Sequence, residues 1–458
     1  MLVPELEKQI GIEVYATRSP GIGGVIRRSI EDFVVEEVLV DGSKATVGQS
    51  TVLNPLGASC VRNRFLLCVL VKHNWDTISA VKAVADQLEI RIDQVQFAGL
   101  KDKRAITAQH VTIEGIAADE AERVHLKDIE FRAVGYLRSE LSPFYLLGNS
   151  FQMRISAISQ PEPTVRKRIQ QMIEEVGQVG GFPNFFGHQR FGTIRPITHL
   201  VGKAIVKGNF KKAAMLFLAK PSPLEHSDSR QARETLRMTG DFKRALKDFP
   251  KQLRYERLML RHLVVKPHDY AGAFRRLPSK LQELFPQAYQ SYLFNKHLSR
   301  RLILGLKPNS FEVGDYAVNV ERSGLPILTL HKIVRTETLA ETNNLLQAGK
   351  MRLAIPLLGY KHKHSIGVDG KIEKQILEEE NISLRDFKVN GMPEISLRGK
   401  LRAAITPLNN FRLEKITADS VDPKRLGANT SFTLYKGCYA TIVLRELMKP
   451  RNLVKAGF

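Results

Sequence analysis

A short loop that places one carboxylate among several cations is the first place in this chain where chemistry could occur. The residues Gly99-Leu-Lys-Asp-Lys-Arg104 follow an apolar lead-in and precede a predicted strand over residues 106–113. The neighbouring cations would favour the ionised form of Asp102, which is the form that acts as a nucleophile or a base. The same cations could instead hold phosphate groups. On spacing alone, a surface turn with weak salt bridges is the more common structure.

A second candidate is the stretch Asn184-Phe-Phe-Gly-His-Gln-Arg-Phe-Gly192, which combines aromatic, glycine, amide and arginine residues. Glycine permits close approach of the backbone, and the aromatic rings could stack on unpaired bases. A tight corner at a domain junction, with its phenylalanines anchored in the core, has the same composition. Both interpretations stay open on the sequence alone.

A third group is Arg27-Arg-Ser-Ile-Glu-Asp-Phe-Val-Val-Glu36. Its pattern favours a core strand over Phe33-Val-Val35 with Arg27 and Arg28 in solvent.

Motifs for nucleotide and metal chemistry are missing from the sequence. There is no GxxxxGK[ST] loop, Gly21-Ile-Gly-Gly-Val-Ile26 lacks the third glycine of a dinucleotide fingerprint, and no HExxH or paired cysteine site occurs. We therefore expect no metal and no cofactor, so that any reaction would depend on side chains.

The elements that must position these residues are of mixed α/β type in the first part of the chain. A buried strand is predicted over residues 65–71, a helix capped by Asp76-Thr77 follows to Leu88, and residues 151–155 alternate as a strand. A helical pattern runs from Val165 to Val176 and ends at a glycine-rich break.

The texture then changes to basic helices. Residues 201–266 contain 16 Lys and Arg against six Asp and Glu, and apolar residues recur there at helical intervals. Residues 281–304 are predicted as a further long helix, and residues 432–434 and 439–444 as strand or strand–helix.

The charge balance indicates an anionic partner. With 69 Lys and Arg against 47 Asp and Glu, the net charge is +22, which favours binding of a polyanion. No apolar run approaches the roughly 20 residues that span a membrane, and the N-terminus lacks a signal-peptide pattern. Three cysteines without CxxC spacing, with Cys68 predicted as a buried thiol, favour the cytoplasm over a disulfide framework.

Several stretches together resemble the TruD family of tRNA pseudouridine synthases. They occur in the family's order over nearly the whole chain: Glu31-Asp-Phe-Val-Val-Glu36, Phe97-Ala-Gly-Leu-Lys-Asp-Lys-Arg-Ala-Ile-Thr107, Gly148-Asn-Ser-Phe151, Asn184-Phe-Phe-Gly-His-Gln-Arg-Phe-Gly192, Gln290-Ser-Tyr-Leu-Phe-Asn295 and Gly437-Cys-Tyr-Ala-Thr-Ile-Val-Leu-Arg-Glu446.

The resemblance implies a catalytic core of the α/β (α+β) class, built on a mixed, largely antiparallel sheet and interrupted by a large, basic, helix-rich insertion domain. Residues 1–180 and 403–458 would form the core, and residues 181–402 the insertion. An RNA-binding cleft would lie between the two lobes.

The resemblance also implies an activity and its residues. A uridine of tRNA, typically position 13, would be isomerised to pseudouridine without a cofactor. Asp102 matches the family's nucleophile, while Phe33, Asn149 and Tyr439 match positions that contact the target nucleotide. Arg27 matches a basic residue near the catalytic carboxylate. Tyr439 and Arg27 stand where some relatives have phenylalanine and lysine, which leaves the finer role of Arg27 open.

Other functions stay open at this point. A non-catalytic RNA-binding or RNA-folding protein on the same scaffold would have the same charge, whereas an RNA methyltransferase would need a cofactor loop that the sequence lacks. We expect a monomer with no obligatory protein partner and no membrane association. Whether Asp102 attacks the base, attacks C1′ or removes a sugar proton is not decided by the sequence.

Overall fold

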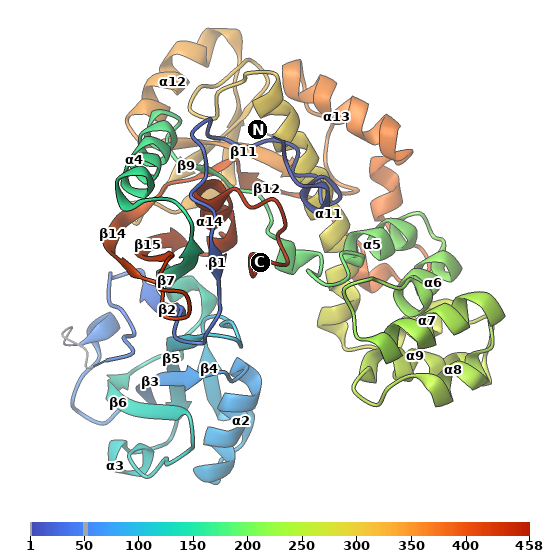
Figure 1. Cartoon of the computed structure of the whole chain (residues 1–458), viewed down its shortest axis with the longest axis horizontal. Coiled ribbons are helices and arrows are strands. Elements are labelled where there is room, and N and C mark those ends of the chain that lie inside the picture. The colour runs from blue at the N-terminus through green and yellow to red at the C-terminus, as the bar shows by residue number, and fades with distance from the viewer. Residues whose placement is uncertain (1, 49–53) are drawn as a thin grey trace.

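A computed structural model of the chain describes residues 2–48 and 54–458. In Figure 1 a large sheet with helices against it occupies one side of the molecule, and a bundle of helices, α5 to α9, occupies the other. The long helix α11 lies between the bundle and a second, smaller sheet.

The large sheet contains nine strands, and it is mixed because β2 and β5 run parallel whereas the other pairings are antiparallel. Its main path is β14-β15-β7-β2-β5-β3-β6, with β1 beside β7 and β4 beside β5. The strands are β1 (Val25–Ile26), β2 (Phe33–Leu39), β3 (Phe65–His73), β4 (Val95–Phe97), β5 (Ile106–Glu114), β6 (Ile129–Leu137), β7 (Leu146–Ile158), β14 (Asn409–Ala418) and β15 (Leu426–Tyr435). The two ends of the chain therefore share one sheet.

One face of this sheet is covered by helices in two separate areas. Paired positions on neighbouring strands point to the same face, so the row Lys72, Thr107, Val35 and Phe151 lies on one side. Helices α2 (Thr77–Gln87) and α3 (Ala118–Ala121) pack on the β3 and β5 end of this face, and α4 (Glu162–Gln178) and α14 (Ala440–Met448) pack on the β7 and β15 end. Polar side chains of the middle strands lie between the two areas.

The chain leaves and re-enters this core through a two-stranded pair, β8 (Phe182–Pro183) with β13 (Ile405–Thr406). The helices that follow β8 are α5 (Thr198–Val206), α6 (Phe210–Ala219), α7 (Ser227–Thr239), α8 (Phe242–Asp248), α9 (Arg254–Val265), α10 (Tyr270–Arg275) and α11 (Ser279–Ile303). The second sheet has the order β10-β9-β11-β12, formed by β9 (Tyr316–Val320), β10 (Pro326–Ile333), β11 (Met351–Leu357) and β12 (Lys400–Ala403). Helix α12 (Leu339–Gln347) packs on β11, and α13 (Gly367–Glu380) packs on α11. Helix α11 packs on α5, α13 and β11 and so joins the bundle to this sheet.

The periodicities of the sequence are confirmed by β3, α2, β5, β7, α4 and α11, and the expected mixed, largely antiparallel fold class is confirmed as well. Of the C-terminal segments, residues 432–434 lie in β15, whereas residues 440–444 are the first part of helix α14. Cys68 is buried as predicted. Among the described residues, no helix is both long enough and apolar enough to cross a membrane.

Candidate active site

The loop that carries Asp102 is fastened to the polar middle of the sheet by a buried lysine. Lys72, at the end of β3, donates its Nζ to the carbonyl oxygens of Asp102 at 2.7 Å and of Trp75 at 2.6 Å. Burial lowers the pKa of Lys72 to about 8, although the charge of Asp102 acts in the opposite direction. Nothing in the sequence distinguishes Lys72, which is one lysine at the end of an apolar run.

Lys101, expected near the Asp102 carboxylate, turns inward instead. Its Nζ lies 2.6 Å from Oε2 of Glu37 on β2, and both side chains are almost completely buried. The other carboxylate oxygen of Glu37 accepts a hydrogen bond from the backbone N–H of His110 at 3.0 Å. Burial acts to raise the pKa of Glu37, but the Lys101 ammonium and the contacts with His110 hold it below its ordinary value. A buried carboxylate requires such a partner, which explains the orientation of Lys101.

The cation that faces the Asp102 carboxylate is Arg27. Its Nη2 lies 3.9 Å from Oδ1 of Asp102, and its Cζ lies 4.1 Å from the centre of the Phe33 ring. The Arg27 side chain is 14% exposed, so the solvated position predicted for it from the sequence pattern is wrong. The Asp102 side chain is 41% exposed and within reach of a ligand. Arg104 does not pair with Asp102 but donates to the carbonyl oxygen of Arg27 at 3.0 Å.

Arg27 retains unused hydrogen-bonding capacity. Its Nε and Nη2 are buried without a hydrogen-bond partner among the described residues, and burial lowers its pKa. Its backbone has a φ of 58°, in the left-handed region that costs a non-glycine residue of order 1 kcal/mol. Unsatisfied donors and backbone strain at one residue are typical of functional sites.

Phe33 and Asn149 lie on the same face of the sheet as this group. Phe33 is 2% exposed and packs edge-on against Phe151 with ring centres 6.3 Å apart. Since Arg27 covers the Phe33 ring, a base could stack there only if the guanidinium moved. Asn149 is opposite Glu37 in the β2–β7 register, and its buried Oδ1 has no hydrogen-bond partner among the described residues.

Tyr439, the N-cap residue of α14, contacts the stretch 184–192. Its ring centre lies 6.1 Å from that of Phe186, and a side chain added at Gly187 would come within 3.0 Å of it. No hydrogen bond among the described residues joins Tyr439 to Asp102. Arg27 thus contacts both Asp102 and Phe33, Asn149 lies on the same sheet face, and Tyr439 lies at the junction with the helical segment.

The core-anchor interpretation of the 184–192 stretch applies to all three of its aromatic residues. Phe185, Phe186 and Phe191 are buried in a cluster that includes Phe294 of α11 and Ile442 of α14. In addition, the guanidinium of Arg402 lies over the Phe186 ring at 4.0 Å.

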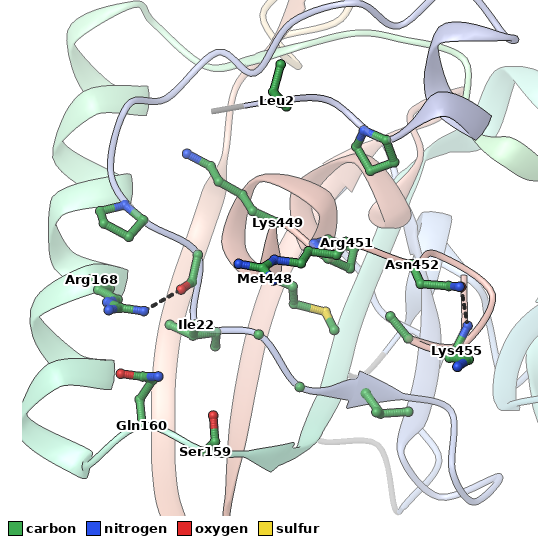
Figure 2. Close-up of a pocket in the computed structure, with 18 of the residues that line it drawn as sticks. Leu2, Ile22, Ser159, Gln160, Arg168, Met448, Lys449, Arg451, Asn452 and Lys455 are labelled. Carbon is green, nitrogen blue, oxygen red and sulfur yellow. Dashed lines mark hydrogen bonds between the residues drawn. The ribbon is translucent and has the colours of Figure 1, made fainter.

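A large pocket of about 1030 Å³ lies elsewhere, between α4 and the two chain ends, and contains none of the candidate site residues (Figure 2). Two of its cations are used by the N-terminal segment: Arg168 donates to the Gly21 carbonyl at 2.7 Å, and Lys449 to the Thr17 carbonyl at 2.8 Å. Arg451 and Lys455 line the same pocket and are exposed. The contacts of Arg168 and Lys449 indicate that these two cations hold the N-terminal segment in place. Within residues 2–48 and 54–458, no group of three or more His, Cys, Asp or Glu residues is placed to hold a metal ion.

Comparison with known proteins places the whole chain beside one family. The family model described as tRNA pseudouridine synthase D (TruD) matches residues 9–447. The probable tRNA pseudouridine synthase D of Methanosarcina acetivorans is 40% identical over 98% of both chains, and that of Thermococcus onnurineus is 37% identical over 95% of this chain and 97% of the relative. A crystal structure assigned as tRNA pseudouridine synthase D from Methanosarcina mazei superposes with a TM-score of 0.83 at 38% identity, covering 98% of this chain and 99% of the other.

Proposed function

The chain belongs to the TruD family of tRNA pseudouridine synthases, and we propose that it isomerises a uridine of tRNA, at position 13, to pseudouridine, with Asp102 as the nucleophile and without a cofactor. The observation that carries the proposal is the half-exposed carboxylate of Asp102 facing the buried, unsatisfied guanidinium of Arg27. This pair supplies a reactive oxygen and a fixed cation at one point of a helix-covered sheet.

The reaction rearranges bonds within one nucleotide. The N1–C1′ bond breaks, the detached base turns, C5 bonds to C1′, and the proton on C5 is lost to solvent. N1 takes up one proton from solvent in place of the one that C5 releases, so atoms and electrons balance without an external oxidant or reductant. The target base must first leave its stack, at a cost of a few kcal/mol.

The roles of the side chains follow from their positions. Lys72 holds the backbone of Asp102, so the carboxylate stays at one height above the sheet. Arg27 faces the carboxylate of Asp102 and could donate to a sugar or phosphate oxygen through its free N–H groups. Asn149 offers an unpaired carbonyl oxygen to a polar edge of the base.

Residues 181–402 act in this proposal as an insertion domain that contributes basic helices to tRNA binding. Residues 201–266 contain more Lys and Arg than Asp and Glu, which supports an electrostatic contribution to tRNA binding. Such a contribution makes the affinity for tRNA strongly dependent on salt concentration. Tyr439 matches a family position that contacts the target nucleotide, and it also contacts the stretch that begins this segment, so in this proposal it holds the nucleotide at the junction.

Tritium release from tRNA labelled as [5-³H]uridine tests the proposal. The native protein should release tritium, and Asp102→Asn should reduce the rate by about 10⁴-fold or more, as loss of a nucleophile commonly does. Asp102→Asn should bind tRNA as the native protein does, because its carboxylate makes no hydrogen bond that holds the fold. If the native protein binds tRNA but releases no tritium, it is an RNA-binding protein on this scaffold and the catalytic proposal fails.

A further inference from the structure

A second, smaller cavity of about 390 Å³ lies between helix α11, the edge strand β12 and the turn that joins β15 to α14. Its wall brings together residues from stretches that are far apart in the sequence, among them Phe186, Gln290 and Gly437. The stretch 184–192, which the reaction itself does not use, thus forms one side of this cavity.

The charge of the wall is positive throughout. No Asp or Glu residue lines the cavity. Five cationic side chains line it: Arg190, Arg398, Lys400, Arg402 and Lys436. Within the described part of the chain, none of these cations forms a salt bridge, although Glu321 is near enough to act on the pKa of Lys436. Partial desolvation lowers the pKa of Lys400, although the residue as a whole is exposed, and the charges of Arg190 and Arg402 lower it further. The wall therefore contains mutual repulsion that a bound anion would relieve.

Two of the guanidinium groups are held in fixed positions. Arg402 donates to the backbone and side-chain oxygens of Asn184 at 3.0 and 2.6 Å, and to the Gly437 carbonyl at 2.9 Å. Arg190 donates to Ser291 at 3.3 Å and to Gln287 at 3.0 Å. Neutral partners fix the geometry of these groups without cancelling their charge.

Two other cations of the wall are available to a ligand, whereas Lys436 donates its Nζ to the Pro143 carbonyl oxygen at 3.0 Å. The side chains of Arg398 and Lys400 make no hydrogen bond to any residue that the structure describes, and Lys400 is exposed. Fixed guanidinium groups beside available cations are an arrangement suited to a phosphate group.

We propose that this cavity binds a phosphodiester of the tRNA strand next to the target nucleotide. Gly437 lines the cavity two residues before Tyr439, and Phe186 lines it while packing against the Tyr439 ring. A strand whose target base lies at Tyr439 would therefore pass its backbone over the cations. The inference rests on the proposed function, since that function assigns Tyr439 to the target nucleotide.

The first test compares two double variants that remove equal charge. Lys400→Gln with Arg398→Gln alters the cavity, and Arg451→Gln with Lys455→Gln alters exposed cations of the pocket in Figure 2. Dissociation constants for an unmodified tRNA transcript are measured over a range of salt concentrations. The cavity variant should bind about tenfold more weakly, with a salt slope shallower by about one unit, whereas the control should change by about twofold or less. Equal changes in both variants, or no change in the cavity variant, would overturn the proposal.

The second test locates the phosphate. The transcript is prepared with one neutral methylphosphonate linkage, either immediately before or immediately after the modified uridine. The native protein should lose affinity for one of these RNAs, and the cavity variant should lose less, because the two changes remove the same contact. A native protein that is insensitive to both linkages would exclude a phosphodiester next to the target.

These outcomes separate the inference from the proposed function. If the native protein releases no tritium but the cavity variant still binds tRNA more weakly than its control, the cavity is an RNA site and the catalytic proposal has failed. If tritium release is normal and both double variants bind alike, the cavity proposal has failed by itself.

Discussion

Two groups of cations in this molecule differ in whether a carboxylate of the protein balances their charge. Around Asp102, Lys101 is paired with a buried carboxylate and Arg27 faces the carboxylate of Asp102 itself. In the cavity at the start of α14, the cations have no carboxylate partner among the described residues, and their fixed contacts are with neutral groups.

The difference separates two uses of positive charge. A cation that is paired with a carboxylate of the protein holds neighbouring groups in position, so its removal should affect folding or turnover. A cation without such a partner raises the free energy of the unliganded protein, so its removal should affect binding and leave the fold intact.

The largest expected effect comes from removing one partner of the buried pair Lys101–Glu37. Lys101→Met should lower the free energy of unfolding by about 3–5 kcal/mol, because Glu37 is left buried and charged without its partner. Urea denaturation at neutral pH measures the change. The double variant with Glu37→Gln should recover much of the loss, and a loss of less than about 1 kcal/mol in the single variant would mean that Lys101 is not a fixing charge.

Replacement of Arg27 should affect the rate of reaction more than the affinity. Arg27→Gln removes the cation 3.9 Å from Asp102 and should slow single-turnover tritium release by about 10- to 100-fold. Binding of tRNA should change by about threefold or less, and Arg27→Lys should restore part of the rate because charge returns without the planar guanidinium. A variant with normal rate and weak binding would place Arg27 with the cavity cations instead.

Acid should reveal the same buried pair in the native protein. The pKa of Glu37 is lowered in the fold, so its stabilising contribution is complete above its ordinary value of 4.5 and is lost as pH falls through the lower, folded value. The urea midpoint of the native protein should therefore fall more steeply below pH 4.5 than that of Lys101→Met with Glu37→Gln. Parallel curves for the two proteins would contradict the shift.

The smallest expected effect is on stability at the cavity. Lys400→Gln should be as stable as the native protein or more stable by about 0.5 kcal/mol or less, since solvent screens this exposed charge. The pKa of Lys400 is lowered, so its charged form costs stability at neutral pH, and this cost disappears as pH rises towards 10.5. The advantage of the variant in thermal unfolding should shrink over the same range. A clear destabilisation would show that Lys400 supports the fold.

The sequence predicted the elements of this fold that depend on local pattern. Strand β3 has continuous apolar residues, and helices α2 and α4 repeat theirs at helical spacing, so both kinds of element follow from neighbours within a few positions. The order of the family stretches then predicted the sheet class and the importance of Asp102.

Contacts across strands could not be predicted in the same way. The sequence placed Lys101 beside Asp102 because they are adjacent, but the parallel pairing of β2 with β5 brings Glu37 to Lys101 instead. The cavity was equally hidden, since Arg190, Gln290 and Lys400 converge only after α11 and the second sheet have folded. Contacts between residues that are far apart in the sequence do not follow from the local pattern of a single sequence.

The pairing of β8 with β13 has a consequence for how this protein could diversify. The long excursion between Pro183 and Ile405 starts and ends at one pair of adjacent strands. The entropy of closing a loop grows only with the logarithm of its length, so doubling or halving the excursion would change this closure cost alone by about 0.6 kcal/mol. Under the proposed function, the segment that contributes to tRNA binding could therefore change in length while the nine-stranded sheet beside the Asp102 loop keeps its strand order.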